Sequence, residues 1–138
     1  MTATEISHVQ SSWAKVVPIA DTAATLFYQR LFEIDPDLRP LFPEDMVAQK
    51  RKLMTAIGAA VRGLDDLKSL VPILQQMGAR HVNYGVKPEH YSTVGSALLW
   101  TLEQGLGVDF TAEVKDAWSA VYGVIAETMQ AGAKAIED

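Results

Sequence analysis

The stretch from Leu70 to Gly85, LVPILQQMGARHVNYG, places a histidine on the apolar face of an expected helix. Leu70, Leu74 and Met77 recur at spacings of three and four residues, which is the period of an amphipathic helix, and His81 continues the same stripe. An imidazole on such a face is either a core histidine bonded to a backbone carbonyl or a ligand of a metal or cofactor. These residues alone leave both interpretations open.

The helical period runs through the rest of the 138 residues. Apolar stripes predict further helices that begin near Thr2, Pro18, Gln49, Pro88 and Thr111. The proline-rich segment DPDLRPLFPED, residues 35–45, interrupts the pattern and predicts a tight corner. No alternating run is long enough to indicate a strand. We therefore expect one all-α domain over residues 1–138, with about seven helical segments.

Polar residues at the expected helix ends support these boundaries. Thr2 and Glu5 have the spacing of a capping box, which predicts the start of the first helix. Asp65 or Asp66 is expected to cap the helix that carries His81. The two aspartates are therefore interpreted as a helix start and not as a catalytic pair.

Composition excludes several classes of function. Twelve basic and 17 acidic residues give a net charge of −5, which argues against nucleic acid and anionic membranes as partners. The absence of cysteine removes disulfides, thiolate metal sites and cysteine nucleophiles. The sequence has no apolar run near the ~18 residues needed to cross a bilayer, and no secretory signal. We expect a cytoplasmic protein that is a monomer or a weak homo-oligomer.

Three expected inward positions carry polar groups, namely Tyr28, Gln49 and His81. An unpaired polar group in an apolar interior costs about 1 to 3 kcal/mol, so each of them requires a partner. Phosphate-binding loops and the common hydrolase and zinc motifs are missing. Because only one histidine points inward, a metal held by side chains alone is not favoured. One imidazole suits a cofactor that supplies its own equatorial ligands, and haem is such a cofactor.

Four segments in order resemble the bacterial single-domain globins and the globin portion of flavohaemoglobins: FYQRLFEIDPDLRPLF, QKRKLM, MGARHVNYGVKPEHYSTVG and AWSAVYGVIAETM. The resemblance implies the globin fold and haem b as cofactor. It implies that His81 is the proximal iron ligand and that Phe42 packs on the porphyrin. It also implies that Tyr28 and Gln49 donate hydrogen bonds to an oxygen ligand.

The resemblance further implies a set of residues that contact the cofactor. Lys52 and Arg80 are expected to meet the haem propionates, although an exposed cation on a helix is an equally good interpretation. The other expected contacts are apolar or aromatic: Leu53, Ile57, Met77, Val86, Tyr91, Val94, Leu98 and Tyr122.

The proximal side departs from the flavohaemoglobin pattern. Tyr91 matches the tyrosine beside the proximal histidine, but Ala133 stands where the family has a glutamate, and Glu127 falls on a different face of its helix. Peroxidase-like chemistry that depends on this glutamate is therefore not expected.

The resemblance implies a globin that binds oxygen, nitric oxide and carbon monoxide. The first expected role is reversible or protective oxygen binding, with nitric oxide dioxygenation as a secondary activity that uses an external reductase. The alternatives are a dedicated nitric oxide dioxygenase or nitrite-reducing enzyme, a haem-based gas sensor, and a haem-free interaction module.

Overall fold

Helices form nearly all of the described chain. The computed structural model describes the backbone of residues 1–137 and the side chains of residues 1–135. It confirms the all-α prediction, and no strand occurs within residues 1–137. The α-helices are α1 (Ala3–Val16), α2 (Ala20–Ile34), α3 (Val47–Gly63), α4 (Leu67–Asn83), α5 (Pro88–Leu106) and α6 (Ala112–Glu137). Four short 3-10 helices join them: η1 (Val17–Ile19), η2 (Pro36–Leu41), η3 (Leu64–Asp66) and η4 (Gly107–Asp109).

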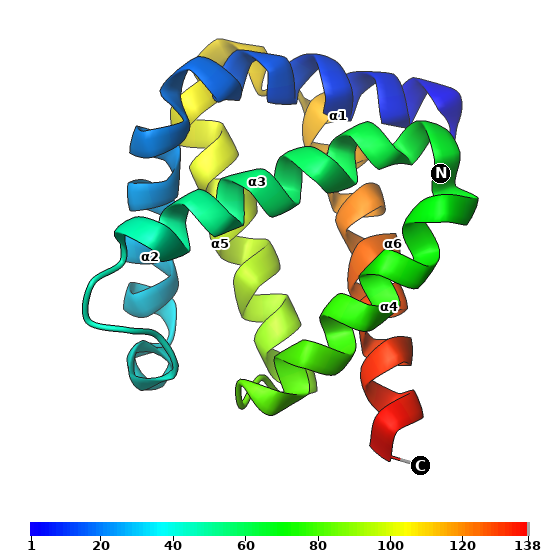
Figure 1. Cartoon of the computed structure of the whole chain (residues 1–138). Coiled ribbons are helices and arrows are strands. Elements are labelled where there is room, and N and C mark those ends of the chain that lie inside the picture. Colours follow the sequence, from blue (N-terminus) through cyan, green and yellow to red (C-terminus); the bar gives the residue numbers. More distant parts are fainter. Residues whose placement is uncertain (138) are drawn as a thin grey trace.

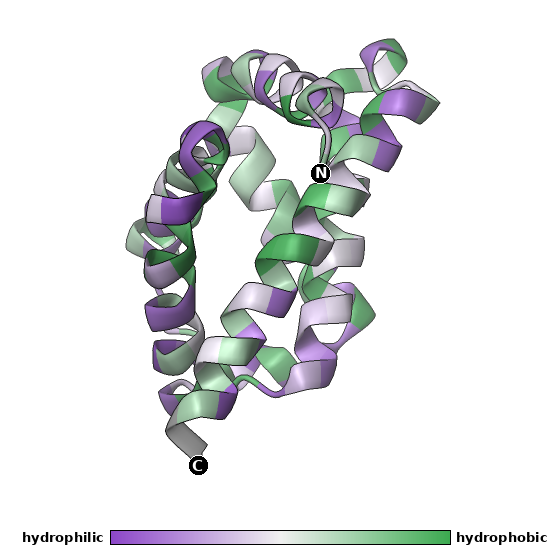
Figure 2. Ribbon diagram, turned by 90° about the vertical axis from the view of Figure 1, so that its right-hand side faces the viewer, coloured by the Kyte–Doolittle hydropathy of each residue, from purple (hydrophilic) through white to green (hydrophobic). Residues whose placement is uncertain are grey.

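The helices pack mainly in pairs (Figure 1). The C-terminal half of α6 lies against α4, and α1 packs on the other half of α6. The α2 helix packs on α5, and α3 connects the α2 side of the molecule to α4. Hydrophobic and hydrophilic residues alternate along each helix, as expected when a helix buries one face (Figure 2). None of the helices within the described residues has the length and hydropathy needed to span a membrane.

Helix ends follow the sequence signals in most places. Thr2 and Glu5 form the expected capping box, and the Thr111 hydroxyl accepts the Val114 N–H at the start of α6. The prediction for the start of α4 was wrong in detail. Asp66 occupies the capping position but makes no capping bond to the backbone, because its carboxylate accepts the Ser69 hydroxyl at 2.7 Å.

Two glycines allow α4 and α6 to cross with their backbones in contact. A Cβ atom at Gly78 would overlap the Met129 carbonyl, and one at Gly132 would overlap the Gln75 carbonyl. The crossing lies one turn before His81 in α4. The position of the α4 helix that carries the histidine is therefore fixed by backbone contact with α6.

Three buried side chains in the core make hydrogen bonds that the sequence did not indicate. Trp118 is buried, and its indole N–H donates to the Ser12 hydroxyl at 2.8 Å. Ser12 in turn donates to the His8 carbonyl at 2.7 Å. The Thr101 hydroxyl donates to the Ala97 carbonyl within α5 at 2.8 Å. Each group is satisfied, so Trp118 belongs to the core and not to an exposed surface.

Candidate functional site

The side chains of Tyr28 in α2 and Gln49 in α3 meet directly. The Gln49 amide donates to the Tyr28 hydroxyl at 3.2 Å, across 21 residues of sequence. Tyr28 is only 4% exposed, whereas Gln49 is half-buried in the first turn of α3. Because the phenol oxygen accepts this bond, its own proton is free to be donated to another group.

Burial keeps the Tyr28 phenol protonated. Desolvation raises its pKa above the usual value, and the Gln49 hydrogen bond offsets this only in part. The side chain is therefore a neutral hydrogen-bond donor over the physiological pH range.

An aromatic cluster surrounds the Tyr28 ring. The ring centroids of Phe42 and Phe32 lie 5.4 Å and 6.0 Å from that of Tyr28, and the two phenylalanines meet edge-to-face at 5.5 Å. Arg39 closes the corner that holds Phe42, because its guanidinium donates to the carbonyls of Phe42 and Pro43 and lies over the Phe32 ring. The proline-rich corner thus places an aromatic ring beside the Tyr28–Gln49 pair.

His81 lies in the last turn of α4 and is half-buried. Its Nδ1 atom is 2.5 Å from the Met77 carbonyl, one turn earlier in the helix. A carbonyl only accepts hydrogen bonds, so the neutral ring carries its proton on Nδ1. Among the described residues Nδ1 is the only hydrogen-bonded nitrogen of this ring, and the Nε2 lone pair remains available to a ligand.

The chain turns sharply after His81. The His81 carbonyl accepts the backbone N–H groups of Tyr84 and Val86, and Gly85 adopts a φ of 86°, which side chains with a Cβ rarely tolerate. The Tyr84 ring meets the His81 ring edge-to-face, with 5.7 Å between their centroids.

On the expected proximal side, the side chain of Tyr122 contacts the backbone of Tyr91. Tyr122 in α6 donates its hydroxyl to the Tyr91 carbonyl at 2.6 Å, and its ring packs on Gly95. Burial raises the pKa of both phenols, and a charge on Tyr91 would raise that of Tyr122 further. Ala133 is half-buried and Glu127 is exposed. The structure thus places no glutamate side chain from these two α6 positions beside Tyr91.

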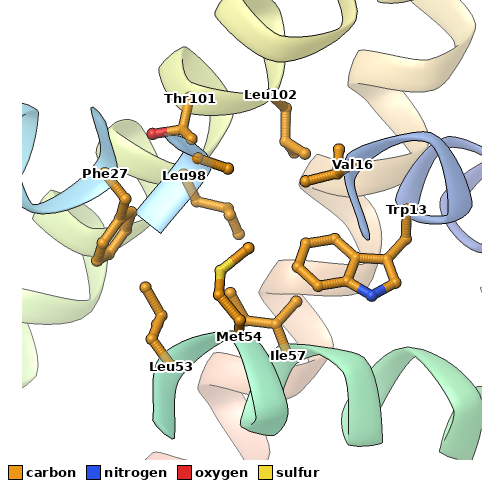
Figure 3. A pocket seen from close by; sticks show the side chains of 10 residues that line it. Trp13, Val16, Phe27, Leu53, Met54, Ile57, Leu98, Thr101 and Leu102 are labelled. Carbon is orange, nitrogen blue, oxygen red and sulfur yellow. The ribbon is translucent and has the colours of Figure 1, made fainter. Parts of the chain in front are cut away.

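Two hollows lie elsewhere between the helices, and Tyr28, Gln49 and His81 line neither of them. The first is a small apolar hollow of about 10 Å³ between α1, α2, α3 and α5, where Trp13, Phe27, Leu53, Ile57 and Leu98 point toward one another (Figure 3). Its volume corresponds to about one water molecule, and its apolar lining disfavours water. The second is a groove of about 250 Å³ between α3 and α4 that extends to Met77.

The other expected contact residues have mixed exposure. Lys52 and Arg80 are exposed, Leu98 is buried, and Leu53, Ile57, Met77, Val86 and Val94 are half-buried. Within the described residues, no group of three or more histidine or acidic side chains could hold a metal ion. His90, a weak candidate from the sequence, accepts the Lys87 N–H at 2.9 Å and caps α5.

Sequence reasoning missed two aromatic residues of the site. Phe32 follows Tyr28 by four residues, and Tyr84 follows His81 by three residues. Residues at these spacings share one face of a helix, so the signal was present in the sequence. Neither residue was singled out, because Phe32 resembles an ordinary core position and Tyr84 lies at the predicted helix break.

Comparison with known proteins identifies relatives over most of the chain. A Tetraodon nigroviridis neuroglobin is 34% identical over 138 residues, covering 90% of this chain and 87% of its own length. A Bacillus subtilis flavohemoprotein is 37% identical over 112 residues, or 78% of this chain. The chain spans only 28% of the length of that flavohemoprotein, so the match concerns one part of it.

Solved structures agree with the sequence relatives. A bacterial globin from Campylobacter jejuni matches with a TM-score of 0.86 at 25% identity and covers 99% of both chains. An engineered carbene transferase from Rhodothermus marinus, a suggested nitric oxide dioxygenase, matches with a TM-score of 0.88 at 25% identity, over 99% of this chain and 96% of its own. The globin family model matches residues 25–129, which include every residue of the site described above except Trp13 and Ala133. The chain belongs to the globin family and has the fold of the bacterial single-domain globins.

Proposed function

We propose that this globin, as one domain over residues 1–138, binds haem b through His81 and uses it to bind oxygen and other diatomic gases. Globins bind haem, and the chain offers the donors that this cofactor needs. The observation that carries the proposal is the bond between His81 Nδ1 and the Met77 carbonyl, because it holds a proton on Nδ1 and leaves Nε2 as the nitrogen that can bind iron.

When bound, haem supplies a ferrous iron that takes up a diatomic ligand, and this chain supplies the groups that act on the ligand. Tyr28 would donate a hydrogen bond through its phenolic O–H to the ligand atom that gains negative charge. The Gln49 bond strengthens the phenol as a donor, because hydrogen bonds in a chain polarise one another. The rings of Phe27, Phe32 and Phe42 pack around the buried Tyr28 ring, and burial from water strengthens a hydrogen bond that its hydroxyl donates.

The remaining contacts follow from the same placement. Phe42, held beside Tyr28 by Arg39, packs on the cofactor, and Leu53 limits the space for the ligand. Lys52 and Arg80 are exposed cations that meet the propionates. The other cofactor contacts are Ile57, Met77, Val86, Tyr91, Val94, Leu98 and Tyr122.

The leading role is reversible or protective oxygen binding. The secondary activity is nitric oxide dioxygenation, which would convert oxygen and nitric oxide to nitrate with one electron that a separate reductase would supply. Similarity to flavohemoproteins and to the suggested nitric oxide dioxygenase of Rhodothermus marinus favours this second candidate. Nitric oxide dioxygenation requires rapid re-reduction of the iron, whereas reversible oxygen binding does not.

The test is the visible spectrum of the haem-reconstituted protein, reduced and then exposed to oxygen. We expect a stable oxygenated spectrum that His81→Ala abolishes. His8→Ala is the matched control, because His8 lies in α1 and its imidazole takes no part in the site. Failure of the wild-type protein to retain haem, or an unchanged spectrum in His81→Ala, would refute the assignment.

A further inference from the structure

Tyr84 is an exposed aromatic residue whose ring packs on a half-buried histidine. Its side chain is 59% exposed, yet its ring meets the His81 ring edge-to-face at 5.7 Å and 64°. The phenol hydroxyl makes no hydrogen bond to another described residue, so the contact depends on the ring. A tyrosine present only for solubility would not need to lie against this side chain.

The backbone holds Tyr84 in this place. Its N–H donates to the His81 carbonyl at 3.1 Å, and Val86 donates to the same carbonyl at 3.0 Å. Gly85, with its φ of 86°, allows the chain to turn so that one carbonyl accepts both hydrogen bonds. The Tyr84 backbone is therefore tied to the residue that its ring contacts.

The Met77 carbonyl alone does not fix the His81 ring. A single hydrogen bond at Nδ1 restrains one edge of the imidazole but still permits the ring to tilt about that bond. A second contact on the ring removes this freedom and also shields it from water. Among the aromatic pairs within the described residues, Tyr84 is the only partner of His81.

We propose that Tyr84 is a positioning residue that fixes the tilt of the His81 imidazole and shields it from solvent. The inference rests on the proposed function, in which His81 binds the haem iron. Tyr84 touches neither iron nor gas ligand in this account and acts only through His81. Its ring, and not its hydroxyl, is the acting group.

The test compares three variants of the haem-loaded, reduced protein. Tyr84→Ala removes the ring, and Tyr84→Phe keeps the ring without the hydroxyl. Ile73→Ala is a matched control, because Ile73 is a similarly exposed side chain, 53% against 59%, on α4, the helix that ends just before Tyr84. The readouts are the iron–histidine stretching band in resonance Raman spectra, the solvent exchange rate of the His81 Nδ1 proton, and the rate of haem loss to an acceptor protein.

We expect Tyr84→Ala to broaden or shift the iron–histidine band and to accelerate Nδ1 proton exchange and haem loss by about two- to tenfold, the factor that corresponds to an edge-to-face ring pair. Tyr84→Phe and Ile73→Ala should match the wild type. The inference is overturned if Tyr84→Ala equals the wild type, if Tyr84→Phe behaves like Tyr84→Ala, or if Ile73→Ala gives the same change. A wild-type protein without an iron–histidine band would instead refute the proposed role of His81.

Discussion

Removal of the Tyr28 hydroxyl is the most direct test of how the site holds oxygen. A hydrogen bond to a charged acceptor contributes about 1.5 to 3 kcal/mol, which corresponds to about ten- to 150-fold in an equilibrium constant. In Tyr28→Phe the Gln49 amide loses its acceptor at 3.2 Å and is released to donate to the ligand itself. Because Gln49 is only half-buried, solvent weakens this replacement bond to about 1 kcal/mol, so the expected loss lies near tenfold.

The assay is stopped-flow measurement of oxygen dissociation, with carbon monoxide dissociation as the internal control. We expect Tyr28→Phe to accelerate oxygen dissociation about tenfold, and to change carbon monoxide dissociation less, because that ligand gains less charge. The double variant Tyr28→Phe with Gln49→Leu should lose a further factor of about five, since no donor remains. An unchanged oxygen rate in the single and double variants would refute the assignment of Tyr28 and Gln49 as donors.

Three further predictions concern stability and are measured by urea unfolding. Gly132→Ala should destabilise the fold by at least about 1 to 3 kcal/mol, because the new methyl group overlaps the Gln75 carbonyl. Gly123→Ala on the same helix meets nothing within 4 Å and should stabilise the fold by a few tenths to about 1 kcal/mol. Equal effects of the two substitutions would contradict the close crossing of α4 and α6. Ser12→Ala should cost about 1 to 3 kcal/mol, because the buried Trp118 N–H loses its acceptor, and a cost near zero would show that the indole finds another. Stability should fall as pH rises above about 10, because burial raises the pKa of Tyr28, Tyr91 and Tyr122, and the folded chain keeps protons that the unfolded chain releases there. The tyrosinate absorbance of these three phenols should appear only as the protein unfolds, and its appearance before unfolding would contradict their burial.

Local signals were sufficient to predict most of the helices. The capping box of Thr2 and Glu5, the proline at position 88 and the hydroxyl of Thr111 each act within one helical turn, so the sequence alone shows them. The capping of α4 failed for a local reason as well, because Ser69 competes for the Asp66 carboxylate. Such competition depends on rotamers, which residue spacing does not reveal.

Long-range contacts of the site required the structure. The sequence resemblance paired Tyr28 with Gln49, but it could not show that the amide donates to the phenol oxygen. The crossing of Gly78 and Gly132 was also invisible, since a glycine in a helix looks like a weak position until its neighbour is known. These contacts join segments that are 21 and 54 residues apart, where periodicity carries no information.

The partner of His81 bears on which chemistry the site favours. A charged carboxylate bonded to a proximal imidazole raises the electron density of the ring, whereas a neutral carbonyl orients the ring with a smaller effect. His81 is bonded to the Met77 carbonyl, position 133 holds an alanine, and the Glu127 side chain is exposed. The Tyr91 phenol is kept neutral by burial. A proximal imidazole that donates to a neutral carbonyl is oriented without the added electron density that promotes bond cleavage, and this is why oxygen binding is the leading proposal and peroxidase-like chemistry is not.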